Sequence, residues 1–130
     1  MFSHVTLGIA DLPRAVAFYT PLMERLGHSL RFQDADTGWA GWQPGTGARP
    51  LFILTRPIDG APPAPGNGTM MAFLARDRAT VDAVYALALS LGGRDEGAPG
   101  LRPHYHPHYY GAYFRDPEGN KLALACHDPA

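Results

Sequence analysis

Three histidines alternate with other residues in the stretch "GLRPHYHPHYYGAYF", which runs from Gly100 to Phe114. His104, His106 and His108 stand at every second position, and Arg102 precedes them. In an extended segment such residues point to one side, so the three imidazoles are candidates to share a face. Imidazole binds divalent metals, and its ordinary pKa of about 6.5 suits proton transfer near neutral pH. The stretch is therefore a candidate metal, acid–base or ligand-binding segment.

Two prolines argue against a regular strand here. Pro103 and Pro107 flank the histidines, and proline is confined to edges, strand starts or bulges because it cannot donate to a ladder. Three interpretations stay open: a metal site, the lining of a pocket, and a solvated loop. Arg102 adds a permanent cation that suits a small anionic or polar ligand. Tyr110 is a further lining candidate, although at least one ring of "YYGAYF" is expected in the core.

Other candidates lie far away in the sequence. His4 falls on the polar face of the alternating stretch "HVTLGI". Trp39 and Trp42 are three residues apart, which on a strand places them on opposite faces, so one of them is a candidate to stack on a ligand. His127 and Cys126 lie near the end of the chain, where an exposed or frayed position is the favoured interpretation.

The composition restricts the class of protein. A chain of 130 residues fits one domain. Its formal charge of -1 supplies no basic field for nucleic acid or an anionic membrane. The lone cysteine forms no disulfide within the chain, and the N-terminal stretch lacks a signal-peptide pattern, so we expect a cytoplasmic protein. No apolar run is long enough to span a membrane.

The elements that carry these candidates occur twice. Residues 4–9 predict a strand, Asp11 a helix cap, the following apolar stripe an amphipathic helix, and Gly27 its end. The same order returns 66 residues later, with Asp77 and Gly93 in the corresponding places. Strand-like segments follow each helix, and "RDPEGNK" predicts a hairpin at 115–121. The chain therefore reads as two copies of a unit with one strand, one helix and about three strands.

The opening "HVTLGIADLPRAVAFY" and the closing "YFRDPEGNKLAL" resemble the vicinal oxygen chelate superfamily of glyoxalases, bleomycin-resistance proteins and extradiol dioxygenases. The resemblance implies an α+β fold in which two βαβββ modules curve around a shared cleft. The modules would occupy about 1–56 and 68–127, joined by a Pro- and Gly-rich linker at about 57–67. It also implies a homodimer.

The resemblance also identifies positions for a metal. Metal-dependent members draw ligands from the first and last strands of each module, and His4 matches the first such position. Met70 and Ala123 stand where His and Glu are habitual, and residues 51–54 offer only apolar side chains. One histidine cannot hold a metal by itself, so we expect no cofactor at the usual site. A divalent metal at a relocated site is the alternative.

We therefore expect a protein of this superfamily that binds a small polar or aromatic molecule in a cleft, without the usual metal site. One alternative is a metal-dependent lyase, isomerase or dioxygenase in which His4 and the loop histidines hold a relocated metal. Another is a non-catalytic interaction module. The candidate catalytic residues are His4, His104 and His106, and the candidate ligand-binding residues are Trp39, Trp42, Arg102, His108 and Tyr110.

Overall fold

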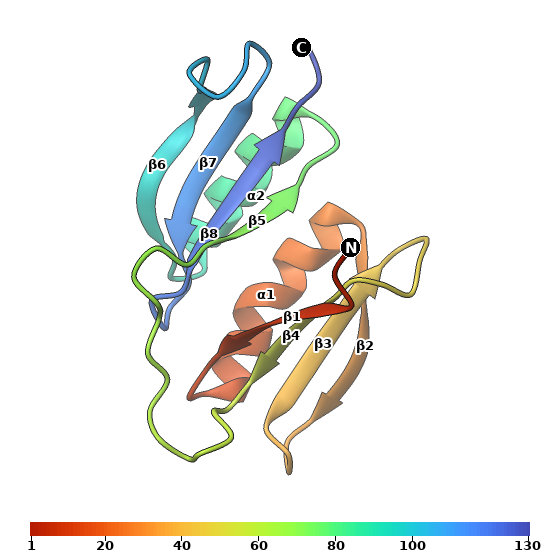
Figure 1. Cartoon of the computed structure of the whole chain (residues 1–130), viewed down its shortest axis with the longest axis vertical. Helices are drawn as coiled ribbons and strands as arrows, with labels where there is room; N and C mark the ends of the chain where they lie inside the picture. Colours follow the sequence, from red (N-terminus) through yellow and green to blue (C-terminus); the bar gives the residue numbers. More distant parts are fainter. The chain divides into compact units, whose positions relative to one another are not determined.

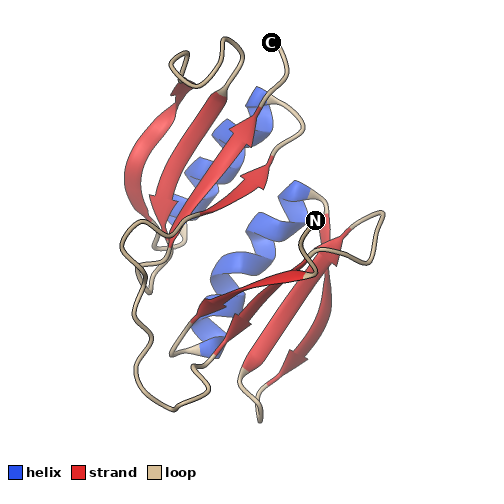
Figure 2. Cartoon of the chain, viewed as in Figure 1, coloured by secondary structure: helices blue, strands red, loops and turns tan.

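The computed structural model describes residues 1–130 and contains two compact units, Met1–Pro65 and Gly66–Ala130. Figures 1 and 2 show that each unit is one sheet with one helix on its face. The boundary falls inside the Pro- and Gly-rich segment 57–67. The elements are β1 (His4–Gly8), α1 (Leu12–Leu26), β2 (His28–Asp34), β3 (Trp39–Pro44), β4 (Leu51–Thr55), β5 (Met71–Leu74), α2 (Arg78–Ser90), β6 (Arg94–Leu101), β7 (Tyr110–Arg115) and β8 (Lys121–Cys126).

The two units share one strand order. In the first, the sheet runs β1-β4-β3-β2, with β1 parallel to β4 and the other pairs antiparallel. In the second, the order β5-β8-β7-β6 repeats this arrangement, with β5 parallel to β8. The predicted α+β fold of two βαβββ modules is confirmed.

The helices begin where the sequence predicts. The Asp11 carboxylate accepts a hydrogen bond from the Arg14 backbone N–H at 3.1 Å, and α1 ends at Gly27, whose φ of 86° is left-handed. Asp77 caps α2 by accepting from both the backbone N–H and the hydroxyl of Thr80, at 2.7 and 2.6 Å. The end of α2 differs from the prediction. The chain turns at Leu91 and at Gly92, with φ 101°, one residue before the predicted Gly93.

The Asp77 cap predicts a specific pH dependence. The hydrogen bonds from the Thr80 hydroxyl and backbone hold the pKa of Asp77 below its usual value. The ionised form therefore stabilises the folded chain at neutral pH, and this contribution is lost as pH falls below about 4 through the lower folded pKa. Asn also caps helices but does not titrate. We expect the difference in Tm between wild type and Asp77→Asn to change between pH 6 and pH 3; a constant difference would contradict this assignment.

The core of the first unit forms where α1 packs on its sheet. Tyr19 lies 5.3 Å from Phe52 and 6.3 Å from Trp42, measured between ring centroids. The Trp42 side chain is 2% exposed. Trp42 is therefore a core residue, and its assignment to a ligand-binding surface is wrong. The spacing of the two tryptophans predicts opposite faces, but not which of those faces meets the helix.

The predicted hairpin at 115–121 is confirmed, and a buried carboxylate holds it. Asp116 is 1% exposed and accepts from the backbone N–H groups of Glu118 and Asn120, both at 2.9 Å. The Asn120 side-chain amide donates to its second oxygen at 3.0 Å. Because one carboxylate satisfies several turn donors, "DPEGN" encodes the geometry of the β7–β8 connection.

No helix in the structure has both the length and the apolar character needed to cross a bilayer.

Candidate functional site

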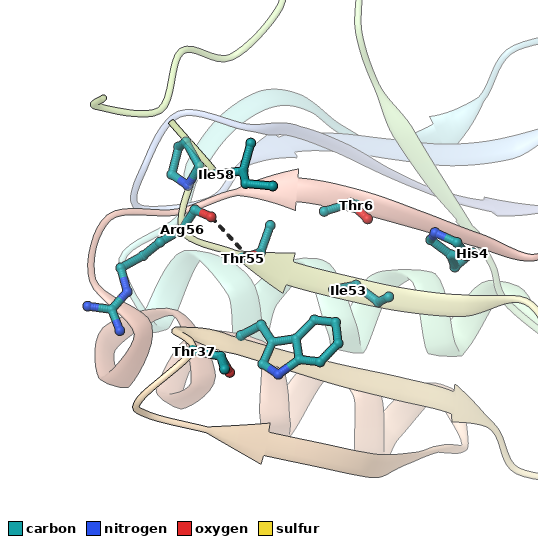
Figure 3. Close-up of a pocket in the computed structure, with 9 residues that line it drawn as sticks. His4, Thr6, Thr37, Ile53, Thr55, Arg56 and Ile58 are labelled. Carbon is teal, nitrogen blue, oxygen red and sulfur yellow. Dashed lines mark hydrogen bonds between the residues drawn. The ribbon is translucent and has the colours of Figure 1, made fainter. Parts of the chain in front are cut away.

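A hollow of about 500 Å³ lies on the first unit, on the side of the sheet that α1 does not cover (Figure 3). We call it the Trp39 pocket. Part of its lining comes from β1, where His4 and Thr6 are two residues apart and share a face. The neighbouring strand β4 contributes Ile53, which pairs with Thr6. The complete lining is His4, Thr6, Thr37, Trp39, Ile53, Thr55, Arg56, Pro57 and Ile58.

The Trp39 indole is the largest aromatic surface in this pocket. It is 40% exposed, and its ring centroid lies 4.5 Å from that of Phe32 on the neighbouring strand. Gly41 gives Phe32 the room to lie there, because a Cβ at Gly41 would come within 2.5 Å of the Phe32 ring. Phe32 therefore supports the indole on one side, which leaves the exposed part of the ring available to a ligand.

Arg56 positions this part of the pocket. Its Nη2 donates to the Ala35 carbonyl at 2.7 Å. The side chain crosses Gly38, where φ is 74° and where an added Cβ would lie 2.0 Å from the Arg56 Nε. Figure 3 shows the guanidinium directed away from the other lining residues. Arg56 therefore fastens the β2–β3 turn that carries Thr37 and Trp39, and does not direct its charge into the pocket.

The remaining polar groups of the pocket are uncharged hydrogen-bonding groups and one imidazole. His4 Nδ1 lies 3.0 Å from the Ser3 hydroxyl, which leaves Nε2 for a ligand, as donor or acceptor according to the tautomer. Thr55 donates to the Arg56 carbonyl at 3.0 Å and keeps acceptor capacity. With Ile53 and Ile58 beside them, these groups form an amphipathic wall typical of small-molecule sites. The sequence pattern indicates His4 and Trp39 as candidates, but it gives no signal for the threonines or Arg56.

The loop histidines do not form a strand. Residues 102–109 fold as consecutive turns between β6 and β7, and His104 and His108 are exposed. The extended strand that would place three imidazoles on one face is not formed, because the prolines interrupt the ladder, as the sequence predicts. Instead, His106 Nε2 lies 2.8 Å from Nδ1 of His127, and the two rings stack with an interplanar angle of 24°. His127 is exposed, as expected, but it contacts His106. Cys126 is 1% exposed, so the expectation of an exposed or frayed position is wrong for Cys126, the last residue of β8.

Tyr109 contacts both rings of this histidine pair. It also contacts Tyr105 and Tyr113, and we call these three residues the tyrosine cluster. Tyr109 lies 4.9 Å from Tyr105 between ring centroids, and its hydroxyl lies 3.2 Å from that of Tyr113. The Arg102 guanidinium lies over the Tyr113 ring, 5.5 Å from its centroid. Burial, and then the hydrogen bond with Tyr109, raise the pKa of Tyr113. Arg102 and His106 therefore belong to one group of aromatic and polar side chains.

Tyr110 points to the opposite face of β7. Its hydroxyl donates to Asp82 on α2 at 2.7 Å, and the Arg78 guanidinium lies 5.3 Å from its ring centroid. The hydrogen bond to Asp82, and then burial, raise the pKa of Tyr110. Tyr110 ties the sheet to the helix, and its assignment to ligand binding stays a prediction. Its neighbour Tyr109 lies with Tyr113 on the other face, as the two-residue period of a strand requires.

The habitual metal positions of the superfamily do not fit a divalent ion in this chain. His4 pairs across the sheet with Leu51, so the strand beside it supplies no ligand. Ala123 is fully buried and pairs with Ala72 on β5 and Tyr113 on β7. Met70, just before β5, offers only a thioether, a poor ligand for hard cations. Nowhere in residues 1–130 do three His, Cys, Asp or Glu side chains gather as a possible metal site.

Comparison with known proteins identifies the class. The family model described as Glyoxalase/Bleomycin resistance protein/Dioxygenase superfamily matches residues 1–124. The chain belongs to this superfamily. No curated protein matches it significantly.

Solved structures agree with this membership. A glyoxalase/bleomycin resistance protein from Albidiferax ferrireducens T118 is 34% identical, with coverage of 97% of this chain and 98% of that chain and a TM-score of 0.87. A glyoxalase-related enzyme from Fulvimarina pelagi shares the fold at 20% identity, 97% and 87% coverage and a TM-score of 0.73. TnmS3, an antibiotic binding protein from Streptomyces sp. CB03234, shares it at 22% identity, 98% and 96% coverage and a TM-score of 0.67.

Proposed function

We propose that this chain binds a small, uncharged, planar aromatic molecule in the Trp39 pocket, and that it does so without a divalent metal. The observation that carries the proposal is the half-exposed Trp39 indole, which Phe32 backs at 4.5 Å and which faces the pocket with His4 and threonine hydroxyls. The indole supplies stacking area, and the imidazole and hydroxyls orient polar substituents.

The charges around the pocket favour an uncharged ligand. Arg56 is the only side chain with a permanent charge in the lining, and its guanidinium is directed away and bonded to the Ala35 carbonyl. A ligand carboxylate would therefore lose its hydration without gaining an opposite charge.

An antibiotic binding protein among the matched structures supports small-molecule binding as a use of this fold. The homodimer implied by superfamily membership is part of the proposal, and light scattering measures it.

Binding can be tested with 4-nitrobenzamide, an uncharged planar aromatic that quenches indole fluorescence, and with coumarin by calorimetry. We expect saturable binding of these probes, with Kd raised at least tenfold in Trp39→Ala and severalfold in His4→Ala, because stacking and orientation are lost. Treatment with EDTA should leave Kd unchanged, since no metal takes part.

Leu30→Ala is the matched control. Leu30 is an exposed apolar residue of the same sheet that does not line the pocket, so its truncation should preserve Kd. Equal Kd values for Trp39→Ala and wild type would refute this site. Loss of binding on metal removal, restored by adding the metal, would refute the metal-free mode.

A further inference from the structure

We propose that the second unit carries a separate site, at Arg102 and the tyrosine cluster, that binds the carboxylate of a small aromatic acid. This site shares no residue with the Trp39 pocket. Unlike that pocket, it offers a fixed positive charge to a ligand. The tests of the two sites use different probes and different variants.

The Arg102 side chain lies in a cradle made by two glycines of β6. A Cβ at Gly100 would lie 3.0 Å from Arg102 Nη1, and a Cβ at Gly97 would lie 3.4 Å from Nη2. Nη2 also donates to the Ala98 carbonyl at 2.8 Å, and the Tyr113 ring lies beneath the guanidinium. A guanidinium held in this way loses less conformational entropy on binding an anion.

The charge of Arg102 is not neutralised by an acidic neighbour. Arg102 forms no ion pair with a carboxylate, and its one hydrogen bond to Ala98 leaves donors of the guanidinium available. Lys121 adds a second cation, 5.8 Å from the Tyr113 ring centroid. The nearby carboxylate of Glu96 is paired with Arg115. The cluster therefore has a local excess of positive charge, although the whole chain carries a formal charge of -1.

The tyrosines add both hydrogen-bond donors and a stacking surface. The Tyr109 and Tyr113 hydroxyls lie 3.2 Å apart and share one hydrogen bond, so a proton of the pair remains for a ligand oxygen. Tyr109 reaches this position because Gly111 leaves room for it, since a Cβ there would lie 2.7 Å from the Tyr109 ring. Tyr105 is 60% exposed and contacts Tyr109, which provides an aromatic face at the solvent side.

These features together define the ligand class. A planar guanidinium with free donors matches the planar fork of a carboxylate, which it can bind through two parallel hydrogen bonds. The exposed Tyr105 ring, with Tyr109 beside it, favours an aromatic body attached to that carboxylate. A small aromatic acid satisfies both requirements, whereas an uncharged aromatic amide satisfies only the second.

Calorimetry with benzoate and benzamide tests the proposal on the full chain. The two probes have nearly the same shape and differ in charge. We expect benzoate to bind more tightly than benzamide, and its Kd to rise at least tenfold in Arg102→Gln. Arg76→Gln is the control, because it removes a positive charge from the same unit at a side chain that is 85% exposed. Its Kd for benzoate should stay within twofold of wild type.

Gly100→Ala tests the cradle without changing any charge. The added methyl group would crowd Arg102 Nη1 and shift the guanidinium slightly, so we expect benzoate affinity to fall severalfold while the Tm and the affinity of 4-nitrobenzamide for the Trp39 pocket stay unchanged. Equal affinities for benzoate and benzamide, or an unchanged benzoate Kd in Arg102→Gln, would overturn the site. Neither result bears on the Trp39 pocket, whose test uses uncharged probes and Trp39→Ala.

Discussion

Trp42→Ala is expected to lower the free energy of unfolding by about 3–5 kcal/mol, the range for removing a large aromatic side chain from a packed core. Trp42 is 2% exposed and lies 6.3 and 6.2 Å from Tyr19 and Phe52, measured between ring centroids. Its removal leaves a cavity between α1 and the first sheet that these rigid rings cannot fill. Urea denaturation followed by far-UV circular dichroism measures the loss.

Trp39→Ala is the matched variant for this prediction. It removes the same side chain from the same strand, but from a position that is 40% exposed. We expect a much smaller loss of stability, because less buried surface disappears, and a large loss of affinity for uncharged aromatic probes. The two tryptophans thus separate folding from binding. Equal losses of stability in the two variants would contradict the division into a core and a pocket face.

Asp116→Ala is expected to destabilise the chain by about 2–4 kcal/mol, because it leaves buried N–H donors without an acceptor. The carboxylate accepts from the backbone N–H groups of Glu118 and Asn120 and from the Asn120 side chain. The loss should also loosen the β7–β8 hairpin, which amide hydrogen exchange at Lys121 and Leu122 would report as faster exchange than in wild type.

Asp59→Ala controls for the loss of an aspartate that closes a turn. Asp59 also accepts from the backbone N–H two residues later, at 2.9 Å from Ala61, but in an exposed loop. Water replaces the lost acceptor there, so we expect a change within about 0.5 kcal/mol. A comparable loss in both variants would show that burial of the Asp116 network is not the source of its effect.

The two proposed sites differ because their charged groups are fixed differently. In the first unit, Arg56 is bonded to the Ala35 carbonyl and directed away from the Trp39 pocket. In the second, Arg102 lies over the Tyr113 ring beside a pair of phenol hydroxyls. The first arrangement favours uncharged aromatic ligands and the second favours carboxylates. An arginine in a binding face therefore predicts anion recognition only when its guanidinium is directed to the ligand.

Much of the fold was predictable because its signals are local. Asp11 and Asp77 cap the helices through bonds to residues three positions later, and Asp116 organises a turn within five residues. Interactions of this range are encoded by residue type and spacing. The recurrence of the same signals after 66 residues therefore sufficed to predict two βαβββ modules.

The candidate site was predictable only in part, because periodicity places residues on opposite faces of a strand without saying which face the helix covers. The pattern offers Trp42 and Tyr110 as ligand contacts, yet both lie on the helix side of their sheets. Their neighbours Trp39 and Tyr109 lie on the other side.

The sequence by itself determined the repeated modules, their caps, the closing hairpin, and the lack of an acidic or histidine side chain at every habitual metal position except that of His4. Only the tertiary structure decided which groups meet from distant positions. His106 contacts His127, and Arg56 reaches Ala35, each across 21 residues of chain. Such contacts depend on how strands pair and on where glycines leave room, and no local pattern of residue types records either.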